Sequence, residues 1–222
     1  MILPAFLFRM TIKQYSSNRR MLFLFATILF TFFYGLVSAQ TVLYSDDFET
    51  DQGWTLTGEF ERGAPGGLGG EHGNSDPNSA YSGSNVLGVD LSGLGTYPGD
   101  YENNLGDRAY TATSAGFDCS GYIDVSLSFQ RWLGVEQDDY DNAYIEVSNN
   151  GGGSWNVVWE NDNTTITDNA WSLQSVDIST YADDEADVQI RFSIGTSDGS
   201  WQYCGWNIDE LAVSGTIIPV NG

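Results

Sequence analysis

Residues 136–141 read EQDDYD and place four acidic side chains close together. In some glycoside hydrolases two acids on one strand face act as nucleophile and acid, and a retaining pair needs carboxyl groups about 5–5.5 Å apart. Here the stretch is turn-like and ends in Asp141, whose side chain is one methylene shorter than that of Glu. Catalysis by Glu136, Asp138 and Asp141 is therefore kept as an alternative hypothesis, and a loop cluster of acids that could hold a cation is favoured.

Several aromatic side chains fall outside the expected core positions or at their ends. Exposed Trp and Tyr faces stack on sugar rings, and such rings beside acids and amides are typical of a glycan-binding groove. The alternative for each ring is that it completes the hydrophobic core. The candidate ligand-binding residues are Trp132, Tyr140, Trp201 and Tyr203.

Three charged side chains stand out because their types are rare in this chain, and the cations Arg131 and Arg191 are expected to find partners. Arg131 shares the inward phase of Phe129, so it is expected to be buried beside a carboxylate in a structural role. His72 is the single histidine of the sequence and lies in a long polar loop, where it is expected to face solvent.

Net charge limits the classes of partner. All 30 acidic residues follow residue 39. The same part of the chain contains four arginines and no lysine, so its formal charge is −26. Such a surface repels nucleic acids and anionic membranes, and it suits divalent cations and neutral or basic partners. The alternative cause of the charge is solubility in a salty habitat, where self-repulsion is screened.

The N-terminal residues indicate export. Arg19 and Arg20 precede an apolar run over residues 21–37, and Val37-Ser38-Ala39 supplies small residues for cleavage before Gln40. This order defines a secretory signal peptide over residues 1–39, with a membrane anchor as the alternative. We therefore expect a secreted or cell-surface protein with no membrane span after cleavage.

The sequence contains two cysteines, Cys119 and Cys204. In an oxidising compartment an even number favours a disulfide, which here would close a long loop and contribute about 4–5 kcal/mol. Two buried thiols are the alternative.

Short alternating runs separated by turn-forming residues predict a single β-sandwich over residues 40–214. The clearest runs are residues 122–133, 143–147 and 188–194, and residues 155–159 follow the second of them after a glycine-rich turn. The first and last strands are expected at residues 41–49 and 206–214. Residues 63–84 and 92–104 read as long loops, and residues 215–222 read as a linker-like tail.

The order of several segments is familiar: DDFETDQGWTLTG, FERGAPGG, AYSGSNVLGVDL, VQIRFSIGTSDGSW and GWNIDELAVSG. The chain resembles the MAM-like jelly-roll modules that accompany secreted bacterial metalloproteases of the immune-inhibitor-A type. It is similar, more loosely, to the cleaved-adhesin modules of gingipains. The resemblance implies an all-β, two-sheet antiparallel jelly roll and an accessory role in adhesion or in glycan or protein binding.

The resemblance also implies a Ca²⁺ site that joins the first strand to the last. Its acids would be Glu49, Asp209 and Asp47, the last of which shares a strand face with Glu49 at a period of two. Backbone oxygens of the turn from Ser82 to Ser84 would complete the site. The family usually has Asp-Asp where this chain has Asp209-Glu210, and the alternative is a merely solvated acidic edge.

Together these features predict a secreted, non-catalytic binding or adhesion module that is stabilised by Ca²⁺. Its partner is expected to be a glycan or an extracellular protein, and it is expected to act as a monomer or as part of a larger protein. A jelly-roll glycosidase or lyase, and a structural spacer from a larger secreted protease, are the alternatives.

Overall fold

The three clearest alternating runs form long central strands. They are β6 (Tyr122–Val135), β7 (Ala143–Ser148) and β11 (Gln189–Ile194). In β6 the apolar residues Val125, Leu127 and Phe129 are buried, whereas the side chains between them remain partly exposed. A period of two therefore places one face of each strand against the core, as the sequence predicts.

The computed structural model describes residues 40–219, and all strand pairs within them are antiparallel. One sheet has the order β10-β6-β12-β4-β3, with β1 beside β12 and β9 beside β6. Its remaining strands are β1 (Thr41–Asp46), β3 (Phe60–Gly63), β4 (Val86–Val89), β9 (Ile166–Thr167), β10 (Ser172–Asp177) and β12 (Gly205–Ile217).

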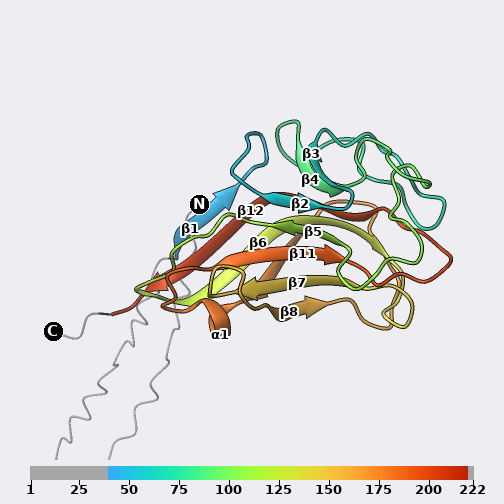
Figure 1. Ribbon diagram of the computed structural model, residues 1–222. Helices are drawn as coiled ribbons and strands as arrows, with labels where there is room; N and C mark the ends of the chain where they lie inside the picture. The colour runs from blue at the N-terminus through green and yellow to red at the C-terminus, as the bar shows by residue number, and fades with distance from the viewer. Residues whose placement is uncertain (1–39, 220–222) are drawn as a thin grey trace, which may run out of the picture. The chain divides into compact units, whose positions relative to one another are not determined.

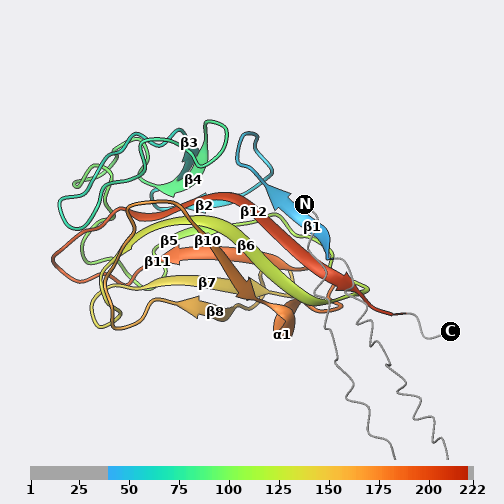
Figure 2. The same ribbon diagram turned by 180° about the vertical axis from the view of Figure 1, so that it is seen from behind.

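The second sheet has the order β2-β5-β11-β7-β8. Its other strands are β2 (Thr55–Thr57), β5 (Tyr110–Thr113) and β8 (Asn156–Glu160), and a short helix, α1 (Ser179–Ala182), follows β10. The two sheets lie face to face (Figures 1 and 2). The prediction of an all-β, two-sheet antiparallel jelly roll is confirmed.

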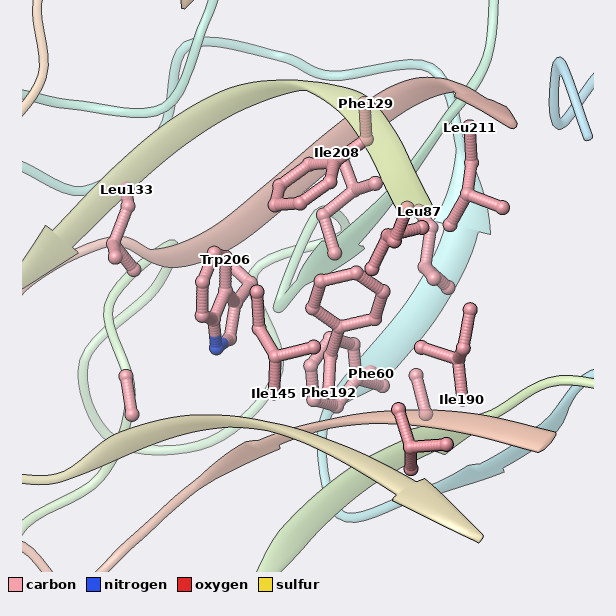
Figure 3. Close-up of a cluster of buried hydrophobic side chains, with 14 of the residues drawn as sticks. Phe60, Leu87, Phe129, Leu133, Ile145, Ile190, Phe192, Trp206, Ile208 and Leu211 are labelled. Carbon is pink, nitrogen blue, oxygen red and sulfur yellow. The ribbon is translucent and has the colours of Figure 1, made fainter. Parts of the chain in front are cut away.

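Trp206 of β12 lies at the centre of the core between the sheets (Figure 3). Its ring makes edge-on contacts with Phe192 and Trp159, each with centroids 5.3 Å apart, and with Phe129 at 6.3 Å. The indole nitrogen donates a hydrogen bond of 3.0 Å to the backbone oxygen of Ser193, so its polar group is satisfied although it is buried. One tryptophan thus contacts side chains from both sheets.

A β-bulge in β8 separates two tryptophans that simple alternation would place on one face. Ile145 pairs with Trp159 and Glu146 pairs with Val157, so Val158 is an extra residue in the register. Trp159 therefore points to the core, and Trp155 lies on the opposite face beneath Arg191. The bulge reverses the alternation at this point, which periodicity alone does not reveal.

The last strand is longer than predicted. β12 continues past residue 214, where Gly215 pairs with Thr41, and Thr216 and Ile217 pair with β6. The sandwich therefore includes residues that the sequence assigns to the tail. The predicted signal peptide, residues 1–39, and the last tail residues, 220–222, lie outside the described residues.

The predicted disulfide between Cys119 and Cys204 is not formed, and both thiols are free and buried. Cys119 lies just before β6 begins, whereas Cys204 lies beside Gly134 near its other end. The strand between these ends is roughly 35–40 Å long, but a disulfide needs Cα atoms within about 7 Å. Burial raises the pKa of Cys119 to about 11 and raises that of Cys204 as well, which keeps both thiols protonated and unreactive.

Residues 64–84 contain no strand and lie over the outer face of the first sheet. The indole nitrogens of Trp132 and Trp171 donate to the backbone oxygens of Ser75 and Ser79. The side-chain amide of Asn207, in β12, donates to Asp76 at 2.6 Å. Figure 1 shows these loops at the end of the sandwich where β12 begins. Within residues 40–219, no helix has the length and apolar character needed to cross a bilayer.

Candidate functional site

Trp201 is one of the strongly exposed aromatic residues of the described chain. It lies in the connection between β11 and β12, and 54 % of its surface is exposed. Its ring stacks almost parallel on His72, with centroids 5.3 Å apart and an interplanar angle of 10°. Because His72 supports one side of the indole, the ring is held in place while much of it faces solvent.

The loop that carries His72 is fixed by close backbone contact. Gly73 has a φ of +71°, and a Cβ atom there would lie 2.9 Å from the ring of Tyr203 and from the methyl group of Thr167. Only glycine allows this approach, which brings His72 within 6.2 Å of the Tyr203 ring. His72 is therefore partly buried between aromatic rings, not free in solvent as the sequence suggests.

The other predicted ligand residues have different environments. Tyr203 is 4 % exposed and belongs to the core, so its ring supports His72 and cannot stack on a ligand at the surface. Trp132 is partly buried and makes an edge-on contact with Trp171 at 6.0 Å. Tyr140 is 47 % exposed in the connection between β6 and β7. Trp201 and Tyr140 are thus the two exposed rings among the four.

Three acids come together near Trp201: Glu136, Asp141 and Asp198. Carboxylate oxygens from all three lie within 4.8 Å of one another. Glu136 follows β6, Asp141 precedes β7, and Asp198 lies in the connection from β11 to β12. The amide of Asn161 holds the first two segments together by donating to the backbone oxygens of Glu136 and Asp141. We call these three residues the acid cluster.

The hydrogen bonds and pKa shifts of the cluster follow from its burial. Asp141 accepts hydrogen bonds from the Tyr101 hydroxyl and from the backbone N–H of Asp198. Burial outweighs these bonds and raises the pKa of Asp141. Burial, and then the charges of Asp141 and Asp198, raise the pKa of Glu136. The cluster therefore concentrates negative charge in a poorly solvated place.

The cluster overlaps only in part with the acids of the glycosidase hypothesis. Glu136 and Asp141 meet, whereas Asp138 is exposed and lies outside the cluster. Asp141 is 1 % exposed, so a polysaccharide has no access to its carboxylate. A catalytic pair must reach both sides of a scissile bond, and this burial argues against such a role.

The residues of the predicted calcium site are brought together at one turn. Glu49 accepts backbone hydrogen bonds of 2.7 and 2.8 Å from Ser84 and Asn85. Asp209, which is fully buried in β12, accepts one of 2.9 Å from Ser82. Gly83 lies so close that a Cβ atom there would be 2.4 Å from the Glu49 carboxylate. The segment after β1, the turn at residues 82–84 and β12 therefore meet at this point.

Asp47 does not share a strand face with Glu49 as expected. β1 ends at Asp46, and Phe48 has a φ of +58°, so the alternation stops before Glu49. The exposed Asp47 carboxylate accepts the backbone N–H of Glu49 at 3.2 Å. Ser82 and Ser84 present their N–H groups to the acids. The geometry thus fits a pair, Glu49 and Asp209, more closely than three acids.

Arg131 meets a carboxylate, as the sequence predicts. Its guanidinium makes two hydrogen bonds to Asp168, of 2.9 and 3.2 Å, and its side chain is 16 % exposed. Asp168 also accepts the backbone N–H of Leu133. The pair fastens the segment after β9 to β6, which is a structural role.

Arg191 also finds an acidic partner, as the sequence predicts, but the network that it forms on the outer face of the second sheet was not identified from the sequence. Glu146 of β7 accepts hydrogen bonds of 2.7 Å from both Arg108 and Arg191. Burial acts to raise the pKa of Glu146, but the two arginines outweigh it and the pKa is lowered. Each guanidinium also lies over an aromatic ring, Tyr144 at 4.1 Å and Trp155 at 4.2 Å.

A signal for this network was present in the sequence. Glu146 stands between two core residues of β7, and Arg191 alternates with core residues of β11, so both must point outward. Their pairing across the strands, which places Arg191 opposite Glu146, becomes known only from the register.

Comparisons with solved structures show similarity in fold. A CBM22 xylan-binding domain from Paenibacillus barcinonensis shares 15 % identity, with a TM-score of 0.47, over 82 % of this chain and 99 % of that one. A cleaved-adhesin domain of Lys-gingipain from Porphyromonas gingivalis W83 shares 16 % identity, with a TM-score of 0.48, over 82 % and 100 %. A family 35 carbohydrate-binding module from Clostridium thermocellum shares 17 % identity, with a TM-score of 0.41, over 77 % and 98 %.

No model of a protein family matches the sequence, and the search of curated proteins gives no match. At these identities the solved structures are similar to this chain in fold alone. Any ligand must therefore be argued from the side chains of this chain.

Proposed function

We propose that this chain is an exported, non-catalytic binding module whose ligand is a neutral glycan. The observation that carries the proposal is the Trp201 ring, which is 54 % exposed and stacked on His72. A ring fixed in this way loses little conformational freedom on binding and offers an apolar face to a sugar. Tyr140, exposed on a neighbouring connection, could extend the contact.

The charge of the chain supports a neutral ligand over an anionic one. The chain after residue 39 contains thirty acidic residues and four arginines. Three of these arginines already pair with Glu146 or Asp168. An anionic polysaccharide would meet repulsion over most of the surface. Uncharged sugars avoid this repulsion and can use carboxylates as hydrogen-bond acceptors.

Affinity electrophoresis in gels that contain neutral polysaccharides, xylan and mixed β-glucan among them, tests the proposal. At least one should retard the protein, whereas alginate should not. Trp201→Ala should weaken binding about fivefold or more, since a stacked ring contributes on the order of 1 kcal/mol. Leu173→Ala, which truncates another exposed apolar side chain, is the control and should bind normally.

Three outcomes would contradict this proposal. Equal retardation of the Trp201→Ala variant would show that the ring is not the contact. Capture by extracellular proteins but by no polysaccharide would make the ligand a protein surface. Binding to neither class would leave the role of a structural spacer.

We also infer that Ca²⁺ stabilises the junction of Glu49, Asp209 and the turn at residues 82–84. Both acids offer hard carboxylate oxygens of the kind that Ca²⁺ prefers. Burial raises the pKa of Asp209, so its charge is poorly compensated by the hydrogen bonds that it accepts. A divalent cation would offset this charge and join the chain after β1 to β12.

A further inference from the structure

The acid cluster gathers three carboxylates from two connections, the one between β6 and β7 and the one between β11 and β12. Glu136, Asp141 and Asp198 place oxygens within 4.8 Å of one another. None of the ion pairs formed by residues 40–219 includes any of them. Neighbouring carboxylates repel one another strongly where solvent is scarce, so the arrangement is costly unless a positive charge is added.

Glu136 is the side chain that points most directly to such a charge. It is 9 % exposed, and its carboxylate takes part in no hydrogen bond with any described residue. Its backbone N–H and C=O are engaged instead with Tyr101 and Asn161. Its oxygens keep some contact with solvent, so an ion can reach them, and the carboxylate faces two further carboxylates without a hydrogen-bond donor among the described residues.

The other two acids are already oriented by the fold. Asp141 is held by the Tyr101 hydroxyl and by the backbone of Asp198. Asp198 uses one oxygen to accept the backbone N–H of Ser200 at 2.7 Å. These bonds orient both carboxylates without neutralising them.

We propose that Glu136, Asp141 and Asp198 form a binding site for a divalent cation, Ca²⁺. Three carboxylates supply hard oxygen ligands, and the absence of Cys and His from the cluster disfavours Zn²⁺. The ion would join the end of β6, the start of β7 and the connection between β11 and β12. Because that connection carries Trp201, the site would also stiffen the exposed ring.

Glu136→Gln in the full-length chain provides the principal test, because it removes one charge and changes the shape little. In a chelator, Glu136→Gln should melt at a higher temperature than the unmodified chain, because repulsion within the cluster is relieved. In millimolar Ca²⁺ the order should reverse, because the variant has lost a ligand. Titration with Ca²⁺ should show a Kd at least about tenfold weaker at this site.

The controls separate this site from the junction at Glu49. Asp138→Asn removes an exposed acid from the same connection but outside the cluster, and it should leave both melting temperatures and the Kd unchanged. Asp198→Asn tests a second ligand in case Glu136→Gln folds poorly. With Glu49→Gln the cluster should still bind one Ca²⁺, as measured by calorimetry or by luminescence of Tb³⁺ in its place.

The proposal is overturned if Ca²⁺ and Tb³⁺ show the same stoichiometry and affinity in Glu136→Gln and Asp138→Asn. It is also overturned if Glu136→Gln is more stable than the unmodified chain both with chelator and with Ca²⁺. Polysaccharide binding is a separate readout, so failure of the cation site would not be confused with failure of the glycan proposal.

Discussion

Asp76 shows at the scale of one residue how burial changes the state of a side chain. It is 1 % exposed, and one of its oxygens has no hydrogen-bond partner among the described residues. Burial raises the pKa of Asp76 to about 8. The hydrogen bond from Asn207 acts to lower this pKa, whereas the charges of Asp100 and Asp90 raise it further. At neutral pH this carboxyl is therefore largely protonated.

The raised pKa of Asp76 predicts how stability depends on pH. The folded chain holds this proton more tightly than the unfolded chain, whose Asp has a pKa near 3.9. The resulting stabilisation is full below about pH 4 and is lost as pH rises to about 8. Asp76→Asn cannot ionise, so it should lack this loss. It should be more stable than the unmodified chain at pH 8 by several kcal/mol, because raising the pKa from near 3.9 to about 8 is worth roughly 5 kcal/mol.

Melting temperatures between pH 4 and pH 8, measured in a chelator, would test this prediction. Asp51→Asn removes an exposed acid and serves as the control, because its curve should follow that of the unmodified chain. If the curves for Asp76→Asn and the unmodified chain stay parallel over this range, Asp76 is ionised in the folded chain and the prediction is wrong.

At the scale of elements, β12 connects most parts of the molecule. It pairs with β1, β4 and β6, and it carries Trp206 into the core and Asp209 to the other face. Asp209 and Ser82 are joined by a hydrogen bond although 127 positions separate them in the sequence. A stabilising ion at this point would therefore resist the separation of segments that are distant along the chain.

The proposed junction predicts a calcium-dependent melting temperature. A ligand at one hundred times its Kd stabilises a folded protein by about 2.7 kcal/mol. Calcium should therefore raise the melting temperature of the unmodified chain and of Asp51→Asn by several degrees. Glu49→Gln and Asp209→Asn should lose the part of this rise that comes from the junction. Glu136→Gln, which alters only the acid cluster, should keep that part. An unchanged rise in both junction variants would exclude the site.

For the whole molecule, the main feature is unbalanced negative charge. Thirty acids and four arginines follow residue 39, and several acids are buried. Repulsion between exposed charges acts over a Debye length of about 30 Å at 0.01 M salt but about 3 Å at 1 M. The stability of this chain should therefore depend on ionic strength.

We expect NaCl to stabilise the protein even when a chelator removes divalent cations. Screening should raise the melting temperature by roughly 2–4 °C for each kcal/mol of repulsion removed. Sucrose of equal osmolarity is the control for effects unrelated to charge. A melting temperature that does not change with NaCl would mean that the negative charges contribute little net repulsion.

Local patterns in the sequence determined the class of fold. The alternation in residues 122–133 and 188–194 fixed which side chains face the core, because side chains in a strand alternate whatever their partners are. The rarity of arginine also predicted that Arg131 would meet a carboxylate, which proved to be Asp168. These inferences rely on periodicity and charge, and both can be read from one chain.

Only the tertiary structure decided which distant residues meet. It separated Cys119 from Cys204 by the length of β6, buried Tyr203 and exposed Trp201, and brought Asp198 from a separate connection to Glu136 and Asp141. Register, bulges and the paths of long loops control these contacts, and they depend on packing between segments far apart in the sequence. The sequence alone therefore indicated an acidic β-sandwich, whereas the sites that it could offer to a ligand or an ion depended on the folded arrangement.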